Sequence, residues 1–152
     1  DDLGTQKSLQ ISAEMYREMI KPYHKKIYSF VQENFPKVKV FLHSCGAIYD
    51  LIPDLIDAGV QILNPVQISA NGMDPKKLKA EFGRDLVFWG GGANMQTFVQ
   101  NASVEEIRAH VDGLIQDFAP GGGYVFTQVH NIQYGVEPEK VLAIYETAKK
   151  YR

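Results

Sequence analysis

His43 and Cys45 are the residues of this chain best suited to chemistry, because they stand two positions apart between an apolar run and a glycine. The run at 38–42 is typical of a buried β-strand, and the apolar spacing at 48–56 is typical of an amphipathic helix. In parallel α/β proteins, ligands bind at the carboxyl ends of the strands. A catalytic zinc site uses three protein ligands such as imidazole and thiolate and keeps one position open. The pair therefore predicts a zinc site; the alternative is a Cys45 that packs as a small apolar side chain beside a His43 bonded to a loop carbonyl.

The elements that must position this pair alternate along the chain. Apolar spacing and the Gly and Pro positions predict strands at 37–43, 60–65, 86–89 and 124–129, and helices at 12–35, 48–58, 76–82, 104–118 and 138–150. Strands that alternate with helices, without a hairpin signal, indicate a parallel sheet. We therefore predict one α/β domain over residues 1–152, with about four βα units, as half of a TIM (β/α)8 barrel or as a small open sheet.

Local signals predict where some of these helices begin, bend and pack. Ser103 and Glu106 predict a capping box at the start of the 104–118 helix, and Pro22 predicts a kink or a break in the first helix. The apolar residues of that first helix recur at helical spacing; they are Met15, Met19, Tyr23, Ile27 and Phe30. The residues of the last helix that are expected to face inward are Val141, Leu142, Tyr145 and Ala148.

All four predicted strands end in polar side chains. They are His43 and Cys45, Asn64 and Gln67, Asn94 and Gln96 beyond the glycines, and Gln128 and His130. Strand ends of a barrel meet at one mouth, so the coincidence favours a pocket over unrelated loop residues that satisfy backbone groups. His130 occupies a strand end equivalent to that of His43 and is the expected third zinc ligand. His24 and His110 lie among charged neighbours in helices and are expected to be solvated.

Composition bounds the class of protein and its partners. The 152 residues include 16 basic and 18 acidic side chains, a balance that favours neither a nucleic acid nor a membrane surface as partner. A single Cys cannot form an internal disulfide, which fits a reducing, cytoplasmic location. No apolar run approaches the ~20 residues that cross a bilayer. The first residues are acidic and polar and lack a Met, so we expect no signal peptide and an origin inside a longer protein.

Five stretches of the chain resemble the uroporphyrinogen decarboxylase superfamily, which also contains the corrinoid-dependent methyltransferases. They are DDLGTQ at 1–6, FLHSCGAI at 41–48, ILNPVQ at 62–67, FWGGG at 88–92 and VHNIQ at 129–133. The resemblance covers nearly the whole chain and corresponds to the carboxy-terminal half of the family's TIM barrel. It implies a barrel fold and an enzyme.

The resemblance favours the methyltransferase branch. That branch has His-x-Cys after a barrel strand and a third zinc ligand, commonly Cys, after the last strand; the chain matches at His43 and Cys45 and departs at His130. The implied reaction moves a methyl group between a corrinoid, carried by a partner protein, and a thiol or similar small acceptor. The residues expected to bind substrate are Asp2, Asn64, Gln67, Asn94 and Gln128.

Two alternatives remain at this stage. One is decarboxylation of a tetrapyrrole in porphyrin biosynthesis, which the resemblance implies would need no metal. The other is a non-catalytic half-barrel fragment that self-associates, because half a barrel exposes two sheet edges and a broad apolar interior. Either a homodimer or a place in a longer chain would cover those surfaces.

Overall fold

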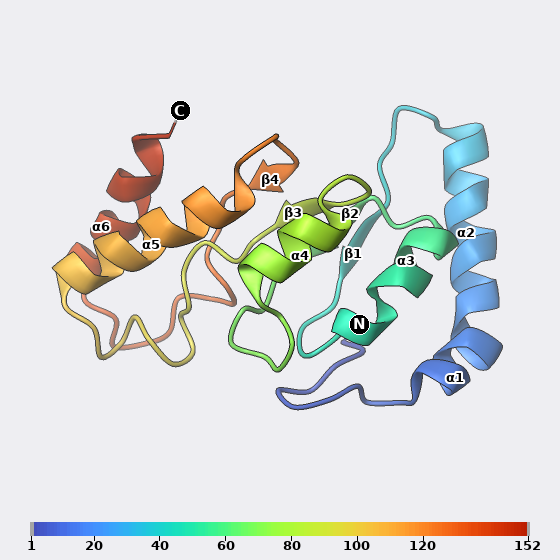
Figure 1. The fold of residues 1–152 in the computed structure, drawn as a ribbon, viewed down its shortest axis with the longest axis horizontal. Helices are drawn as coiled ribbons and strands as arrows, with labels where there is room; N and C mark the ends of the chain where they lie inside the picture. Colours follow the sequence, from blue (N-terminus) through green and yellow to red (C-terminus); the bar gives the residue numbers. More distant parts are fainter. Residues whose placement is uncertain (1, 152) are drawn as a thin grey trace.

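The structure, a computed structural model, describes residues 2–151 of the chain (Figure 1). Its elements follow one another as α1 (Ala13–Met15), the π-helix η1 (Tyr16–Ile20), α2 (Lys21–Asn34), β1 (Phe41–His43), the 3-10 helix η2 (Tyr49–Leu51), α3 (Ile52–Ala58), β2 (Ile62–Asn64), α4 (Pro75–Phe82), β3 (Val87–Trp89), α5 (Val104–Phe118), β4 (Tyr124–Val125) and α6 (Pro138–Lys149). Within this part of the chain, no helix combines the length and apolarity needed to cross a membrane.

The four strands form one parallel sheet in the order β1-β2-β3-β4. Sequential parallel strands joined by helices are the architecture of half a TIM barrel, so the predicted fold class is confirmed. In this register His43 lies directly beside Asn64. The last strand is shorter than predicted, since β4 ends at Val125. Beyond it the chain stays beside the segment after β3 through the Gly92 N–H, which donates to the Thr127 carbonyl oxygen, and through an isolated bridge between Val129 and Asn94.

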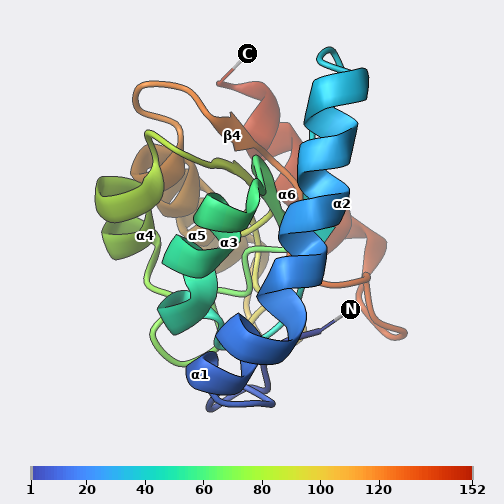
Figure 2. The same ribbon diagram turned by 90° about the vertical axis from the view of Figure 1, so that its right-hand side faces the viewer.

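Alternation along the strands decides which side chains reach the concave side of the sheet. Leu42, Leu63 and Phe88 point toward the covering helices and belong to the buried core. Successive side chains of a strand point to opposite faces, so the neighbours Phe41 and His43 point the other way and are exposed. The helices α3, α4 and α5 cover only one face of the sheet (Figures 1 and 2). The sheet therefore presents His43 on the open side.

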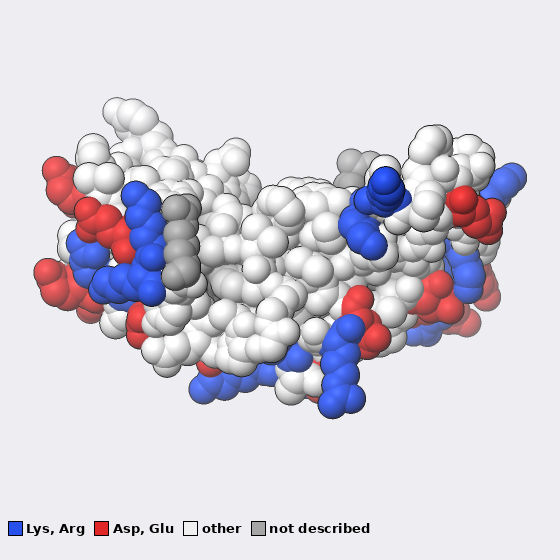
Figure 3. Space-filling model, turned by 90° about the horizontal axis from the view of Figure 1, so that it is seen from above, with Lys and Arg blue, Asp and Glu red and all other residues white. Residues whose placement is uncertain are grey.

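The open side is also the side with the fewest charges. Seen from above, the molecule is a crescent whose hollow is largely uncharged, while Lys, Arg, Asp and Glu gather at its two ends and along its convex side (Figure 3). In a complete barrel the hollow would be the barrel interior, which is filled by side chains rather than by water. The distribution of charge thus agrees with the half-barrel architecture.

Several local signals in the sequence have their predicted effect. The Ser103 and Glu106 capping box is present at the start of α5, and Asp74 caps α4 by accepting a hydrogen bond from the Lys77 N–H. Pro22 lies in the first turn of α2, directly after the π-helix η1. Because proline lacks an N–H group, the regular α-helical hydrogen bonding is interrupted here by a π turn, in which the Lys21 N–H donates to the Tyr16 carbonyl oxygen. The helical segments nevertheless follow one another without a gap from Ala13 to Asn34.

The buried faces of the first and last helices differ from the prediction. In α6 the buried side chains are Ala143, Ile144 and Thr147. Of the residues predicted to face inward, Ala148 packs against the core and Val141 is half-buried, whereas Leu142 and Tyr145 are exposed. Along α1, η1 and α2 the predicted apolar stripe lies on the outer face; its members Met15, Met19, Tyr23, Ile27 and Phe30 are all exposed. These two helices flank the two open edges of the sheet, so each lacks a neighbour on one side within residues 2–151.

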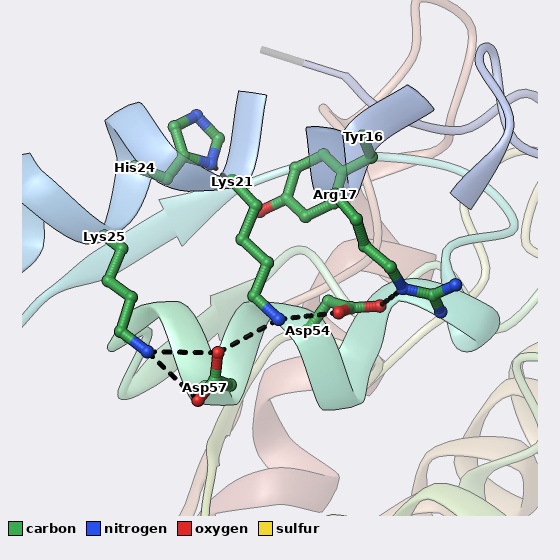
Figure 4. Close-up of polar contacts among 7 residues, drawn as sticks. All are labelled: Tyr16, Arg17, Lys21, His24, Lys25, Asp54 and Asp57. Carbon is green, nitrogen blue, oxygen red and sulfur yellow. Dashed lines mark hydrogen bonds and ion pairs between the residues drawn. The ribbon is translucent and has the colours of Figure 1, made fainter. Parts of the chain in front are cut away.

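Ion pairs hold the inner side of the first helices against α3 (Figure 4). Asp54, which is only 7% exposed, accepts hydrogen bonds from Arg17 at 2.8 Å and from Lys21 at 2.7 Å. Asp57 pairs with Lys21 at 3.0 Å and with Lys25 at 3.2 Å. These five residues are referred to below as the ionic seam. A buried carboxylate that has a cationic partner on each oxygen is compensated for its loss of water.

Candidate metal centre

A pocket of about 510 Å³ opens at the carboxyl ends of the strands. Its lining residues are Asp2, Phe41, His43, Cys45, Asn64, Pro65, Trp89, Thr127, Gln128, His130 and Asn131. The lining includes the last residues of β1, β2 and β3 and the segments that follow β1, β2 and β4, so all four strand ends contribute, as the barrel prediction requires. The aromatic rings of Phe41 and Trp89 meet edge to face, with centroids 5.4 Å apart, and form an apolar wall of the pocket.

Three potential metal ligands meet in this pocket. The donor atoms of Asp2, His43 and Cys45 all lie within 4.8 Å of one another. His43 Nε2 is 3.8 Å from Cys45 Sγ and 3.9 Å from Asp2 Oδ1. Zinc bonds of 2.0–2.3 Å in a tetrahedral site imply ligand separations of about 3.3–3.8 Å, so small side-chain adjustments would suffice. One carboxylate, one imidazole and one thiol therefore fit a zinc ion that keeps an open position.

The N-terminal segment brings Asp2 to this pocket by crossing the loop after β1. The Cys45 N–H donates to Asp2 Oδ1 at 2.8 Å, and the Leu3 N–H donates to Ser44 Oγ at 3.0 Å. The crossing is so close that a Cβ on Gly46, which has φ +92°, would lie 2.3 Å from the Gly4 carbonyl carbon. Glycine is required where backbones approach this closely with positive φ. The segment 2–4 therefore packs directly against the loop at 43–46.

The thiol of Cys45 has a raised pKa. Partial burial is the main cause, and the charge of the Asp2 carboxylate and its hydrogen bond with the thiol add to it. Each of these disfavours a thiolate, because the anion would lose water and lie beside another anion. A bound cation would reverse this balance, since it would attract both groups.

His43 has a second set of neighbours on the far side of its ring. Its Nδ1 atom is 2.7 Å from Asn64 Oδ1, and Asn64 Nδ2 donates to the Trp89 carbonyl oxygen at 2.9 Å. Asn64 is therefore where the sequence placed it, at a strand end in the pocket lining, and it contacts a candidate ligand directly.

His130, predicted as the third ligand, lies in the same pocket but outside the cluster of three donor atoms. Its backbone is in the left-handed region, with φ +64°, directly after the bridge between Val129 and Asn94. Its Nδ1 is 3.2 Å from Gln133 Nε2. The structure thus brings Asp2 to the place that the sequence prediction gave to His130. Gln128 lines the pocket as predicted, and its Oε1 accepts a hydrogen bond from the Tyr145 hydroxyl at 2.7 Å.

Gln67 and Asn94 were predicted to bind substrate, but the structure places both outside the pocket lining. Gln67 is buried; its Oε1 accepts from the Gly46 N–H at 2.7 Å, and its Nε2 donates to the Gln6 and Gln96 side chains. Asn94 Oδ1 accepts from the backbone N–H groups of Gln96 and Thr97. Their hydrogen bonds hold the loops that surround the pocket.

Two histidines that were expected to be solvated are partly buried instead. His24 Nδ1 lies 3.1 Å from the hydroxyl of the buried Tyr16, and His110 Nε2 lies 3.3 Å from the Asn94 N–H. Burial is the main cause that lowers the pKa of both imidazoles. Charged residues nearby in the sequence did not reveal these contacts, because both histidines face neighbouring elements rather than solvent.

Comparison with known proteins identifies the family to which the chain is similar. The family model described as uroporphyrinogen decarboxylase (URO-D) matches residues 4–151. A uroporphyrinogen decarboxylase of Thioalkalivibrio sulfidiphilus is 40% identical over 57 residues, which are 38% of this chain and 16% of that protein. One from Pelodictyon phaeoclathratiforme is 26% identical over 145 residues, which are 92% of this chain and 38% of that protein.

A solved structure agrees with the fold. A methyltransferase from Methanosarcina mazei superposes with a TM-score of 0.70 over 93% of this chain and 38% of that chain, at 20% sequence identity. At this identity the match concerns the fold alone. The chain spans less than two fifths of the length of these relatives.

Proposed function

Because the chain belongs to the uroporphyrinogen decarboxylase family, we propose that it forms the zinc-binding part of a methyltransferase site, in which a methyl group passes between a corrinoid and a thiol. The observation that carries this proposal is the meeting of Asp2, His43 and Cys45 in one pocket at the strand ends. A decarboxylase that needs no metal has no evident use for a thiol, an imidazole and a carboxylate whose donor atoms converge.

Zinc bound there would supply Lewis-acid chemistry, which lowers the pKa of an acceptor thiol so that thiolate persists near neutral pH. The chain's own residues prepare the site for it. Asp2 contributes a negative charge, and the Gly4 and Gly46 crossing holds that charge beside the other two donors. Phe41 and Trp89 offer an apolar wall against which a flat macrocycle or an alkyl chain could pack.

Zinc content of the purified 152-residue chain tests the proposal. Elemental analysis of protein prepared without chelator is expected to give about one zinc per chain, and the Cys45→Ala variant is expected to give none. His130→Ala is the matched control, because His130 lies in the same pocket outside the donor cluster. Zinc that persists in Cys45→Ala would overturn the proposed ligand set.

Methyl transfer is tested with methylcobalamin and a small thiol as model substrates. The absorbance change on loss of the methyl group should be faster with the zinc-loaded chain than with the Cys45→Ala variant. Since this chain spans only part of the length of its relatives, the assay should be repeated with a fusion of the chain to the amino-terminal half of a relative. No acceleration in either form would contradict methyl transfer.

Decarboxylation of a tetrapyrrole is the second candidate, because both curated relatives bear the name uroporphyrinogen decarboxylase. It predicts a pocket that functions without zinc. Absence of metal in the wild-type chain, together with release of carbon dioxide from uroporphyrinogen, would favour it over methyl transfer.

We also propose that the isolated chain self-associates. The outer faces of α2 and α6 expose apolar side chains beside the two open edges of the sheet, for example Ile27 and Leu142. Light scattering after size exclusion should give a mass above that of the 17.1 kDa chain. A stable monomer at micromolar concentration would contradict this.

A further inference from the structure

We infer that Asn64 is a positioning residue, which holds the His43 ring in the tautomer that leaves Nε2 unprotonated and directed at Cys45 and Asp2. The inference deepens the proposed zinc site and rests on it for its functional meaning, although its structural content can be tested without metal. Three neighbouring strand ends take part, because His43 ends β1, Asn64 ends β2 and Trp89 ends β3.

The orientation of the Asn64 amide follows from its contact with β3. A backbone carbonyl oxygen can only accept, so the Asn64 atom that lies 2.9 Å from the Trp89 oxygen must be the NH₂ group. The reverse orientation would place two acceptor oxygens at that distance. Asn64 Oδ1 therefore faces His43, and this assignment does not depend on distinguishing nitrogen from oxygen by shape alone.

The amide in turn selects the tautomer of the ring. Asn64 Oδ1 lies 2.7 Å from His43 Nδ1, and since an amide oxygen only accepts, Nδ1 must carry the hydrogen. In a neutral imidazole the other nitrogen, Nε2, then holds a lone pair. That atom is 3.8 Å from Cys45 Sγ and 3.9 Å from Asp2 Oδ1. The lone pair is thus presented on the side where the other two donors lie.

The register of the sheet makes this arrangement stiff. His43 and Asn64 are directly paired across β1 and β2, so the distance between their Cα atoms is set by the backbone ladder. The second hydrogen bond ties the amide to β3 and prevents it from rotating. An outer partner of this kind fixes the ring of a metal-binding histidine, and losing it typically weakens metal binding about 10–100-fold.

Three variants separate positioning from simple packing. Asn64→Ala removes the acceptor, and Gln128→Ala changes another amide in the pocket lining. Asn64→Asp keeps an acceptor for the Nδ1 hydrogen but loses the N–H that donates to the Trp89 carbonyl oxygen. Asn64→Asp should rescue the tautomer that Asn64→Ala loses. Circular dichroism and thermal unfolding of each variant confirm that the fold persists.

The first readout is the tautomer in metal-free protein, from imidazole ¹⁵N shifts assigned with a His43→Gln variant. We expect Nδ1–H in the wild type, in Gln128→Ala and in Asn64→Asp, and a mixture of tautomers in Asn64→Ala. A wild-type ring protonated on Nε2, or a tautomer unchanged in Asn64→Ala, would overturn the inference. This readout stands whether or not the chain binds zinc.

The second readout is zinc affinity, measured by competition with a chromophoric chelator. We expect Asn64→Ala to bind about 10–100-fold more weakly than the wild type. Asn64→Asp should recover part of this loss, because it keeps the acceptor for Nδ1 but not the bond to the Trp89 carbonyl oxygen. Equal affinity in Asn64→Ala and wild type would overturn the positioning role. A wild-type chain that does not bind zinc would instead overturn the proposed function, while the tautomer measurement would still decide on Asn64.

Discussion

Asp54 and Asp2 show two uses of the same carboxylate. Asp54, in the ionic seam, is buried, and each of its oxygens accepts a hydrogen bond from a cation at 2.7–2.8 Å. Asp2, at the pocket, accepts a backbone N–H from Cys45 and lies 3.9 Å from His43 Nε2. The negative charge of Asp54 is thus balanced within the chain by Arg17 and Lys21.

This difference indicates which of the two carboxylates can still bind a cation from solution. A carboxylate that already has two cationic partners contributes to stability and has little left to offer a ligand. Asp2 lies beside the Cys45 thiol, whose pKa is raised, and beside the His43 ring at 3.9 Å, so a cation bound from solution is expected to contribute the charge that balances these donors. The predictions below test this division.

Asp2→Asn should have the largest effect, on metal binding rather than on folding. The amide oxygen can still accept the Cys45 N–H, so the crossing of the two loops should persist. Loss of the charge should lower zinc affinity by more than about 100-fold, because a ligand matters more than the outer partners whose loss costs 10–100-fold. Calorimetric titration measures this, and the Asp54→Ala variant should bind zinc like the wild type. A wild-type affinity in Asp2→Asn would remove Asp2 from the ligand set.

Asp54→Ala should affect folding rather than metal binding, and we expect it to destabilise the fold by about 2 kcal/mol. Its removal leaves Arg17 and Lys21 without their shared partner, although Arg17 is half exposed and can return to water. Urea unfolding at neutral pH, followed by circular dichroism, measures the change. An unchanged midpoint would show that packing alone holds α2 on α3.

Acid should weaken the seam in a defined range of pH. Burial of Asp54 opposes its charged form, but hydrogen bonds from Lys21 and Arg17 outweigh that effect and lower its pKa. A carboxyl whose folded pKa lies below its unfolded value of about 3.9 stabilises the fold fully above that value. The stability is then lost as the pH falls through the lower, folded pKa. Unfolding free energies measured below about pH 4 should therefore fall more steeply in the wild type than in Asp54→Asn.

The sequence predicted that polar side chains meet in a pocket at the strand ends, but it predicted less well which of them form the cluster of potential metal ligands. His43, Cys45 and Asn64 follow from strand ends of a parallel sheet, where position along the chain translates directly into position in space. Asp2 was assigned to substrate rather than metal, because the first residues carry no periodic pattern that would place them. Their place depends on long-range backbone contacts with the loop at Gly46. In the sequence His130 also appeared to end a strand, but β4 ends at Val125, and His130 has a left-handed backbone directly after the bridge at Val129.

The helices show a similar limit. Spacing and the capping box predicted the extent of α5, which packs between α4 and α6 in the helical layer. The same spacing correctly predicted a helix at α2, but the apolar stripe that it identified lies on the outer face. A helix at the edge of the layer can have apolar side chains on two sides. The ion pair between Lys21 and Asp54 shows which side of α2 faces inward. Periodicity finds an apolar stripe but does not say which neighbour covers it.

Lys25→Ala should have the smallest effect, and it completes the comparison from within the seam. Lys25 reaches Asp57 at 3.2 Å, but both side chains are more than half exposed, and Asp57 has Lys21 as a second partner at 3.0 Å. Exposed pairs gain little, since water and salt screen them. The shift in urea midpoint should thus be far below that of Asp54→Ala and should shrink further in 0.5 M salt. Equal shifts for the two variants would mean that the seam acts as one network of charges, and that burial of Asp54 is not what distinguishes it from Asp2.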